Sequence, residues 1–275
     1  DISHPNIIPH VLPQRYPTVL FKRPLQSFTE KVMYRFWSRV LPVITRGNWL
    51  DKAVLWRSQL LEACSHLIER HDIRNVVVTG APFSLMAHAC GLRDRHPAIN
   101  LVADFRDPWT WGHYYGQGML STRRRSEEQR QEALVARTFN KLISPAPDII
   151  AHLRKTYGGE MDRYVLLPHA IDPGEMGTQE GISKDGTFRM IYAGSLYGAA
   201  EAEAYFEQVL RAFEQLRRIA PDRFQHTLFD LYITGHGTGA YQEKVNARGL
   251  SEHIRFHAPL PARESFPRIA AADLV

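Results

Sequence analysis

The chain has 275 residues, 44% hydrophobic and 23% charged, a composition that excludes disordered, collagen-like and coiled-coil proteins. Its formal net charge of +5 is compatible with an anionic ligand or a membrane surface and too diffuse to indicate nucleic acid. No apolar run reaches the roughly 20 residues of a membrane helix, and two cysteines, Cys64 and Cys90, form no disulfide framework, so we expect a cytoplasmic protein.

The first region, up to about residue 47, is the least regular. Prolines there indicate turns and extended pieces around one helix, expected over 27–40. Asp51 is expected to cap a second helix that runs to about residue 70. The β-branched run 73–79 then has the composition of a buried strand. Regular alternation therefore begins after residue 50.

Helices and strands alternate along the next part of the chain. We expect helices over 83–95, 126–140 and 147–157, and strands over 99–103, 141–144 and 164–167. Such alternation is typical of βαβ units and a parallel sheet. Residues 1–170 are therefore predicted to form one α/β domain.

A second α/β domain is expected over 187–275, after a linker over 171–186 that is rich in Gly, Pro, Ser, Thr and acidic residues. Its predicted strands are 188–193, 228–234 and 253–257, and its predicted helices are 199–220, 241–248 and 263–272. The last three residues lie where a further strand should begin. We therefore expect the second domain to be incomplete and the sequence to be part of a longer protein.

Ligands of open parallel sheets bind beyond the carboxyl ends of the strands, so the loops there are the candidate sites. After the strand 73–79, Gly80 permits a tight turn, and Ser84 lies at a helix N-terminus whose free amides suit an anion or a sugar hydroxyl. The alternative is an ordinary turn with a helix cap. Both interpretations stay open at this loop.

The loop after the strand 99–103 carries the densest charge. Asp104, Arg106 and Asp107 stand within four residues, and Trp109 opens an aromatic segment that continues to residue 115. Carboxylates with aromatic faces are what sugar recognition needs, because rings stack on sugars and carboxylates accept from hydroxyls. The alternative is a structural ion pair of Arg106 with Asp104 or Asp107.

Two glycine turns follow strands of the second domain. Gly194 and Ser195 enter a helix where a diphosphate could sit. Gly235 opens a G-x-G-x-x-G/A pattern, but no acid follows at the end of the next strand to hold a ribose, so NAD is not expected. No H-E-x-x-H, G-x-S-x-G or P-loop pattern occurs, and we expect neither a metal nor a cofactor.

Taken in order, several segments resemble the GT-B glycosyltransferases, specifically the group-1, family 4-like retaining enzymes with an Arg-Asp-Pro-Trp signature. The matching segments are 79–84, 103–109, 166–172, 191–197 and the stretch from 249 to 275. The run 104–109, Asp-Phe-Arg-Asp-Pro-Trp, is the most specific of them. The resemblance covers about residues 48–275.

This resemblance implies two Rossmann-like domains that face a cleft. It implies a nucleotide-diphosphate sugar as donor, held mainly by the second domain at Gly194, Ser195 and Gly235. On the acceptor side it implies Gly80, Ser84, Asp104 and Trp109. Asp107 and Arg106 occupy the loop where relatives often place a His-Asp pair near the reacting sugar, and Asp107 is the stronger catalytic candidate because Arg replaces His.

The expected function is therefore a glycosyltransferase that moves a hexose to a glycan or lipid-linked acceptor with retention, as in polysaccharide biosynthesis. The family's Glu-x7-Glu donor segment and its first Gly-rich loop are missing from the 275 residues, so this stretch is expected to be inactive alone. A nucleotide-sugar epimerase-like enzyme and a non-catalytic binding module stay open as alternatives.

Residues 27–40 have the pattern of a helix that lies at a lipid interface. Lys31, Arg35 and Arg39 recur at i, i+4 beside an apolar side that includes Phe28 and Phe36. A second cluster, 109–125, adds aromatic residues and three adjacent arginines. We therefore expect peripheral binding to an anionic surface, the inner face of the plasma membrane. A helix docked on its own domain would show the same periodicity.

Overall fold

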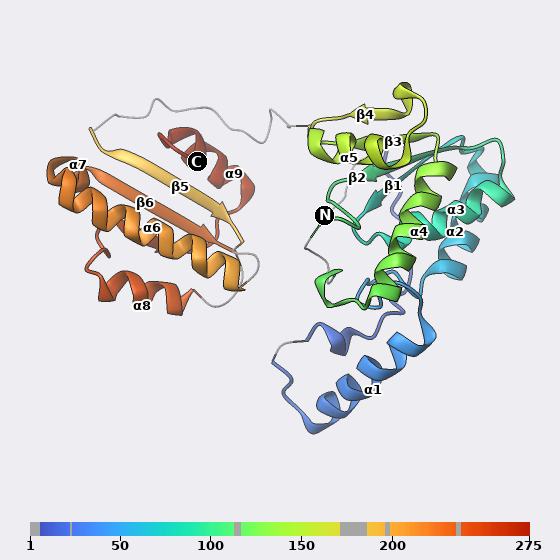
Figure 1. The fold of residues 1–275 in the computed structure, drawn as a ribbon, viewed down its shortest axis with the longest axis horizontal. Coiled ribbons are helices and arrows are strands. Elements are labelled where there is room, and N and C mark those ends of the chain that lie inside the picture. Colours follow the sequence, from blue (N-terminus) through green and yellow to red (C-terminus); the bar gives the residue numbers. More distant parts are fainter. Residues whose placement is uncertain (1–5, 23, 113–116, 171–185, 196–198, 235–237) are drawn as a thin grey trace. The chain divides into compact units, whose positions relative to one another are not determined.

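The computed structural model describes residues 6–22, 24–112, 117–170, 186–195, 199–234 and 238–275. The chain divides into two compact units, Asp1–His169 and Ala170–Val275 (Figure 1). The predicted linker falls almost wholly on residues outside the described ranges. Each unit is an α/β structure with its own parallel sheet, as the alternation of strands and helices predicts.

The sheet of the first unit has its strands in the order β1-β2-β3-β4, all parallel. These strands are β1 (Asn75–Gly80), β2 (Asn100–Phe105), β3 (Lys141–Ser144) and β4 (Tyr164–Leu166). The helices that follow or precede them are α2 (Arg57–His71), α3 (Ser84–Arg95), α4 (Thr122–Thr138) and α5 (Pro147–Tyr157). A single-turn helix, Gln117–Met119, precedes α4. The strand positions expected from the sequence are confirmed to within about two residues.

The core of this unit lies between the sheet and its helices. Leu101, Ala103 and Phe105 occupy every second position of β2 and are almost fully buried. Leu142 in β3 is also buried in this core. Because each strand leads through a right-handed crossover to the next strand on the same side, the crossover helices share one face of the sheet. On β1, Val77 points to the other face and is 60% exposed.

The N-terminal residues form a small lobe with a core of its own around Tyr16, Leu20 and Leu41. Its main element is α1 (Phe28–Ile44), which starts with a capping box: the Ser27 hydroxyl accepts from the backbone N–H of Glu30, whose carboxylate accepts from the N–H of Ser27. The helix continues through Pro42 and therefore ends at Ile44, four residues later than the sequence suggests.

The expected cap of the next helix is wrong. The helix α2 begins after Trp56, not at Asp51. The Asp51 carboxylate instead accepts from the backbone N–H groups of Ala53, at 2.8 Å, and of Ser84, at 2.9 Å. Asp51 therefore caps α3, which begins 33 residues later, and joins the N-terminal lobe to the sheet domain.

Arg124 makes a second connection between the lobe and the sheet domain. Its guanidinium donates to the carbonyl of Gly47 at 2.6 Å, to that of Thr45 at 3.2 Å and to that of Pro42. These carbonyls lie at the carboxyl end of α1, where backbone acceptors have no partner within the helix. The charge at the start of α4 is thereby placed against the negative end of another helix.

The second unit contains a sheet in the order β5-β6-β7, also parallel. Its strands are β5 (Phe188–Gly194), β6 (Thr227–Ile233) and β7 (Ile254–His257), and its helices are α6 (Ala199–Ile219), α7 (Pro221–Gln225), α8 (Gly239–Ala247) and α9 (Ala262–Ala271). Phe229 and Leu231 of β6 face the core formed with α6, whereas Tyr232 accepts from Arg268 of α9 on the opposite face. The unit is therefore wound on both faces of its sheet.

The strand expected at the end of the sequence is present as one parallel bridge. Leu274 pairs with Met190 of β5, and the N–H of Ile191 donates to the carbonyl of Leu274 at 2.9 Å. Since β6 lies on the other side of β5, the strand order changes direction at β5. In doubly wound sheets this switch point is where a ligand crevice forms, beyond the carboxyl ends of the strands.

We expect Arg124→Ala to lower the free energy of unfolding by about 2–3 kcal/mol, because three half-buried carbonyls lose a charged donor. Urea unfolding measures the change. The matched control is Arg123→Ala, since Arg123 is exposed on the same turn and its loss should cost less than about 0.5 kcal/mol. Equal effects of the two substitutions would contradict the capping role.

Candidate functional site

The carboxyl edge of the first sheet gathers the charged residues predicted there. The hydroxyl of Thr79, near the end of β1, donates to Asp104 Oδ2 at 3.1 Å. Arg106, just after β2, places Nε 4.0 Å from the same Asp104 oxygen and donates to Nδ1 of His169 at 3.2 Å. His169 follows β4, so the cluster extends from β1 to β4 along one edge of the sheet.

The structure therefore shows the ion pair between Arg106 and Asp104 that the sequence offered as an alternative. The side chain of Arg106 is 52% exposed and that of Asp104 is 20% exposed, so the pair lies at the surface with one side open to a ligand. The contact to Nδ1 requires a neutral His169 whose proton is on Nε2, because the guanidinium has only donors. Asp107 is half-buried in the same loop, and its catalytic role stays a prediction.

Trp109 does not face a ligand. It is 1% exposed, stacks on Phe83 with centroids 5.1 Å apart, and donates from Nε1 to Glu128 at 2.7 Å. A ring enclosed in this way cannot stack on an acceptor sugar, so we correct its expected role from acceptor contact to support of the loop. Of the other aromatic residues expected there, Trp111 is 40% exposed and stacks on His152, and residues 113–115 lie outside the described ranges.

Two buried carboxylates on α4 hold this loop, and the sequence did not reveal them. Glu128, 3% exposed, accepts from the backbone N–H of Asn48 at 2.6 Å, from Trp109 and from the Gln117 amide at 3.4 Å. One turn later Glu132, 1% exposed, accepts from the hydroxyls of Thr110 at 2.5 Å and Tyr157 at 2.7 Å. Their only sequence signal is the spacing i, i+4, which is also typical of a solvated helix face.

Burial in this cluster shifts the pKa values of Glu128 and Tyr157. Burial raises the pKa of Glu128, although its N–H donors oppose the shift. Burial and the adjacent Glu132 raise the pKa of Tyr157. Gly47, next to this cluster, has φ of +68°, and an added Cβ would lie 2.1 Å from Glu128 Oε1. Only glycine therefore fits where the lobe meets α4.

The loop after β1 is occupied from within the chain. Ser84 is 5% exposed, and its N–H is bonded to Asp51, whose pKa burial raises. A Cβ on Gly80 would come within 2.8 Å of Phe83 and 2.9 Å of Met86, so close packing explains this glycine. The acceptor-side roles of Gly80 and Ser84 stay predictions, and the cap interpretation of this loop has direct support.

In the second unit, Gly194 and Ser195 lie at the carboxyl end of β5, beside the switch point. The carbonyl of Gly194 accepts from the N–H of Thr234 at 2.8 Å, and the Ser195 hydroxyl is hydrogen-bonded to that of Thr234. The Tyr192 hydroxyl donates to the carbonyl of Ser195 at 2.7 Å. Hydroxyls from neighbouring strand ends are thus brought together, whereas Gly235 lies outside the described residues.

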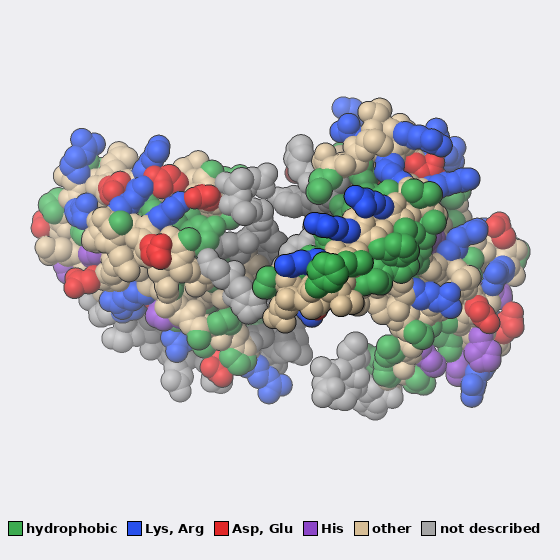
Figure 2. Space-filling view, turned by 90° about the horizontal axis from the view of Figure 1, so that it is seen from below, with side chains coloured by type: hydrophobic (Ala, Val, Ile, Leu, Met, Phe, Trp, Pro, Cys, Tyr) green, Lys and Arg blue, Asp and Glu red, His purple; other side chains and the backbone are tan. Residues whose placement is uncertain are grey.

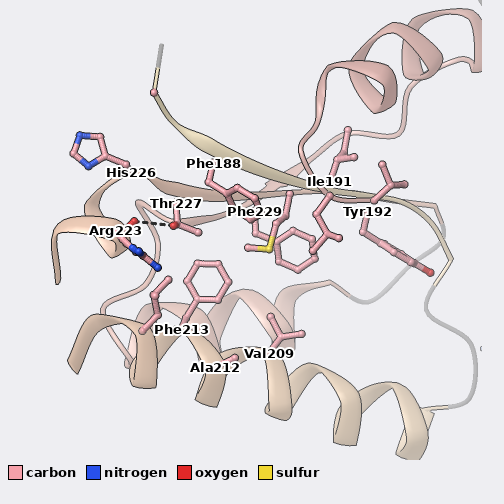
Figure 3. A pocket seen from close by; sticks show the side chains of 15 residues that line it. Phe188, Ile191, Tyr192, Val209, Ala212, Phe213, Arg223, His226, Thr227 and Phe229 are labelled. Carbon is pink, nitrogen blue, oxygen red and sulfur yellow. Dashed lines mark hydrogen bonds between the residues drawn. The ribbon is translucent and has the colours of Figure 1, made fainter. Parts of the chain in front are cut away.

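A cavity of about 810 Å³ in the second unit has a different character (Figure 3). Phe188 and Phe229 of the sheet face Val209 and Phe213 of α6 across it, and nearly all of its wall is apolar. It reaches the amino ends of β5 and β6, where Thr227 Oγ1 donates to the carbonyl of Arg223 at 2.8 Å. These amino ends lie at the edge of the sheet opposite to Gly194, and the cavity and the predicted donor loop share only Tyr192 among the residues named so far, since its hydroxyl donates to Ser195.

Among the described residues, no group of three or more His, Cys, Asp and Glu side chains is arranged to hold a metal ion. The polar groups that the structure does bring together are one carboxylate, one guanidinium, one imidazole and one hydroxyl at the edge of the first sheet. Such a set can accept hydrogen bonds from hydroxyls and can pair with an anion.

We expect Glu128→Gln to lower the free energy of unfolding by about 1–3 kcal/mol at neutral pH, because the new amide turns a donor toward either Asn48 N–H or Trp109 Nε1. Glu127→Gln is the matched control, since among the described residues Glu127 pairs with the exposed Arg130 at i, i+3. Urea unfolding of both variants measures the difference. The role of Glu128 is contradicted if the two variants are equally stable.

The same carboxylate predicts a pH dependence. Because burial raises the folded-state pKa of Glu128, its stabilising contribution is complete below the ordinary value of 4.5 and is lost as pH rises through the raised value. The unfolding free energy of the wild type relative to Glu128→Gln should therefore fall as pH rises above about 4.5. A difference that does not change with pH would show that the pKa is not raised.

Comparisons with known proteins bear on the fold. No family model matches the chain, and no curated protein matches it. Sucrose-phosphate synthase from Thermosynechococcus elongatus aligns with 99% of this chain and 62% of its own, at 11% identity and a TM-score of 0.53. UDP-GlcNAc 2-epimerase from Neisseria meningitidis bound to UDP-GlcNAc aligns with 78% of this chain at 10% identity and a TM-score of 0.45. The lipopolysaccharide outer core galactosyltransferase WaaB aligns with 78% of this chain at 11% identity and a TM-score of 0.47.

These alignments cover 56% of the epimerase chain and 52% of the WaaB chain, so this chain spans a little over half of their length. At such low identity the likeness shows the fold alone, and the synthase carries it. Together with the two parallel sheets, it identifies the fold class as GT-B, an α/β chain of two Rossmann-like units.

Proposed function

We propose that the chain belongs to a nucleotide-sugar-dependent GT-B glycosyltransferase, which moves a sugar from a nucleotide-diphosphate sugar to a glycan or lipid-linked acceptor with retention. The observation that carries the proposal is the cluster of Asp104, Arg106 and His169 at the carboxyl edge of the first sheet, with Asp107 in the same loop. In open α/β sheets this edge is where substrates bind.

The roles follow from the chemistry of these groups. A carboxylate in a half-buried loop can stabilise the positive charge that develops on a sugar ring as its bond to the diphosphate breaks, and we assign this role to Asp107. Arg106 is partly exposed and can pair with an anionic group while Asp104 and His169 hold its orientation. Asp104 can also accept from acceptor hydroxyls.

On the donor side, the proposal uses the edge of the second sheet. Ser195 and Thr234 present hydroxyls beside the switch point at β5, where α6 begins four residues later. Helix N-termini and hydroxyls at such a position suit a diphosphate. The proposed reaction uses no metal, which is what the family resemblance implies, and the nucleotide sugar is a substrate and not a cofactor.

The cytoplasmic location expected from the cysteines belongs to the same proposal. Cys90 is buried, Cys64 is half-buried, and both are free thiols. Burial raises the pKa of Cys90 to about 11 and also raises that of Cys64, so neither thiol is an activated nucleophile. Their chemistry is that of apolar side chains in a core.

Product analysis on the protein together with any flanking sequence tests the proposal. A panel of uridine, guanosine and adenosine diphosphate sugars would be incubated with and without glycan and lipid-linked acceptors, and the products separated by chromatography and identified by NMR. A glycosylated acceptor supports the transferase. An altered free sugar nucleotide would indicate an epimerase-like enzyme, and unchanged substrates with retained nucleotide binding would indicate a non-catalytic module.

We expect Asp107→Asn to lower turnover by more than about tenfold while the fold is retained, because the substitution removes a charge that can stabilise the reacting centre. Asp94→Asn, on the exposed surface of α3, is the matched control and should leave turnover unchanged. Steady-state kinetics and circular dichroism of both variants provide the measurement. Full activity of Asp107→Asn would contradict a catalytic role of Asp107 and would favour the interpretation of these charges as a structural ion pair.

A further inference from the structure

The helix α1 has two sides of different character. Tyr34, Trp37 and Leu41 face the core of the N-terminal lobe and pack with Tyr16 and Leu20. Trp37, which follows the apolar residue Phe36 in the sequence, therefore packs on the lobe and is not available to a lipid. One side of the helix is therefore docked on its own domain, which was the alternative to lipid binding. The opposite side is not explained by this docking.

The opposite side of α1 is apolar and open to solvent. Phe28 is 82% exposed, Val32 46%, Phe36 50% and Val43 83%. Phe28, Val32 and Phe36 recur at i, i+4, and Val43 follows Phe36 at i+7, two helical turns further along, so the four residues form a stripe on one face. Met33 and Ile44, which are 40% and 59% exposed, widen this stripe. Large side chains gathered on one helix face are typical of an interaction surface, whereas scattered ones are not.

Basic residues border this stripe. Lys31, Arg35 and Arg39 are exposed and follow one another at i, i+4. Within the described part of the chain, none of the three makes an ion pair. The one acidic residue of the helix, Glu30, is paired with Lys22 and accepts from backbone N–H groups at the cap. The face is therefore cationic as well as apolar.

Figure 2 shows these properties together. Seen from below, where α1 is the lowest element of the first unit in Figure 1, hydrophobic side chains form a contiguous patch with Lys and Arg side chains at its border. In the described residues, no helix is long and apolar enough to cross a bilayer.

We propose that this face of α1 docks on a bilayer of anionic phospholipid, with its apolar stripe in the interface and its three cations at the headgroups. Charge complementarity selects this occupant: a row of cations along the edge of an apolar stripe matches the phosphates above the acyl chains, because long basic side chains extend toward the headgroups. The inference does not depend on the proposed function.

The proposal rests on α1 and not on the second cluster that the sequence suggested. Arg124 caps the end of α1 through three carbonyls, and Trp109 is buried. Reversing the charge of Arg124 would therefore damage the fold and say nothing about lipid. The residues suited to a test are exposed ones on α1 itself.

Sedimentation of the full chain with phosphatidylglycerol and phosphatidylcholine vesicles tests the proposal. We expect binding to the anionic vesicles only, weakening as salt rises from about 0.1 M to about 1 M. Since each cation near an anionic surface strengthens binding about fivefold, the double variant Arg35→Glu and Arg39→Glu should weaken it by about 30-fold or more. Phe28→Ser with Phe36→Ser should also weaken binding, because it removes the inserted stripe.

Matched controls lie on the second unit. Arg218→Glu with Arg263→Glu makes the same charge change on exposed residues, and Tyr205→Ser with Ile219→Ser removes exposed apolar side chains of α6. Loss of binding in both α1 variants with both controls unchanged supports the proposal. Binding to both vesicle types, binding to neither, or equal loss in the controls overturns it. A change of oligomeric state in the α1 variants, seen by size exclusion, would assign the face to a second copy instead.

Discussion

The buried carboxylate of Glu128 connects parts of the chain that are far apart in sequence. It accepts from the backbone of the N-terminal lobe at Asn48, from the ring of Trp109 in the loop after β2, and from Gln117 before α4. Removing a carboxylate from water is costly, and three N–H donors offset that cost only while all three segments stay in place. The position of the loop that carries Asp104, Arg106 and Asp107 therefore depends on an interaction outside the site.

Local sequence was sufficient for the architecture. The β-branched run that became β1 and the apolar spacing of α6 needed no distant partner to be recognised, and the strand expected near residue 273 does begin to pair with β5. Errors arose where the partner was remote. Asp51 has the sequence position of a cap for the helix beside it, but it caps one that starts 33 residues later, because burial between lobe and sheet brings that helix closer.

The candidate site was only partly predictable for the same reason. Charged residues at the end of a predicted strand point to the ligand edge of a parallel sheet, and the structure does place Asp104 and Arg106 there. Composition does not reveal which face of an aromatic ring is enclosed, so Trp109 was assigned to the acceptor. His169, Glu128 and Glu132 were not recognised, since their partners lie on other elements and an acid pair at i, i+4 also occurs on solvated helices.

The two attachments on α4 lie one helical turn apart. Arg124 donates to carbonyls at the end of α1. Glu128, about 6 Å further along the same helix, accepts from Trp109 in the loop after β2. Because α4 is bonded to both segments, a rotation of α1 against the sheet domain would also move the loop after β2 that carries Arg106. The N-terminal lobe and the carboxyl edge of the first sheet are therefore attached to the same helix, so the tilt of α1 and the direction in which that edge faces depend on each other.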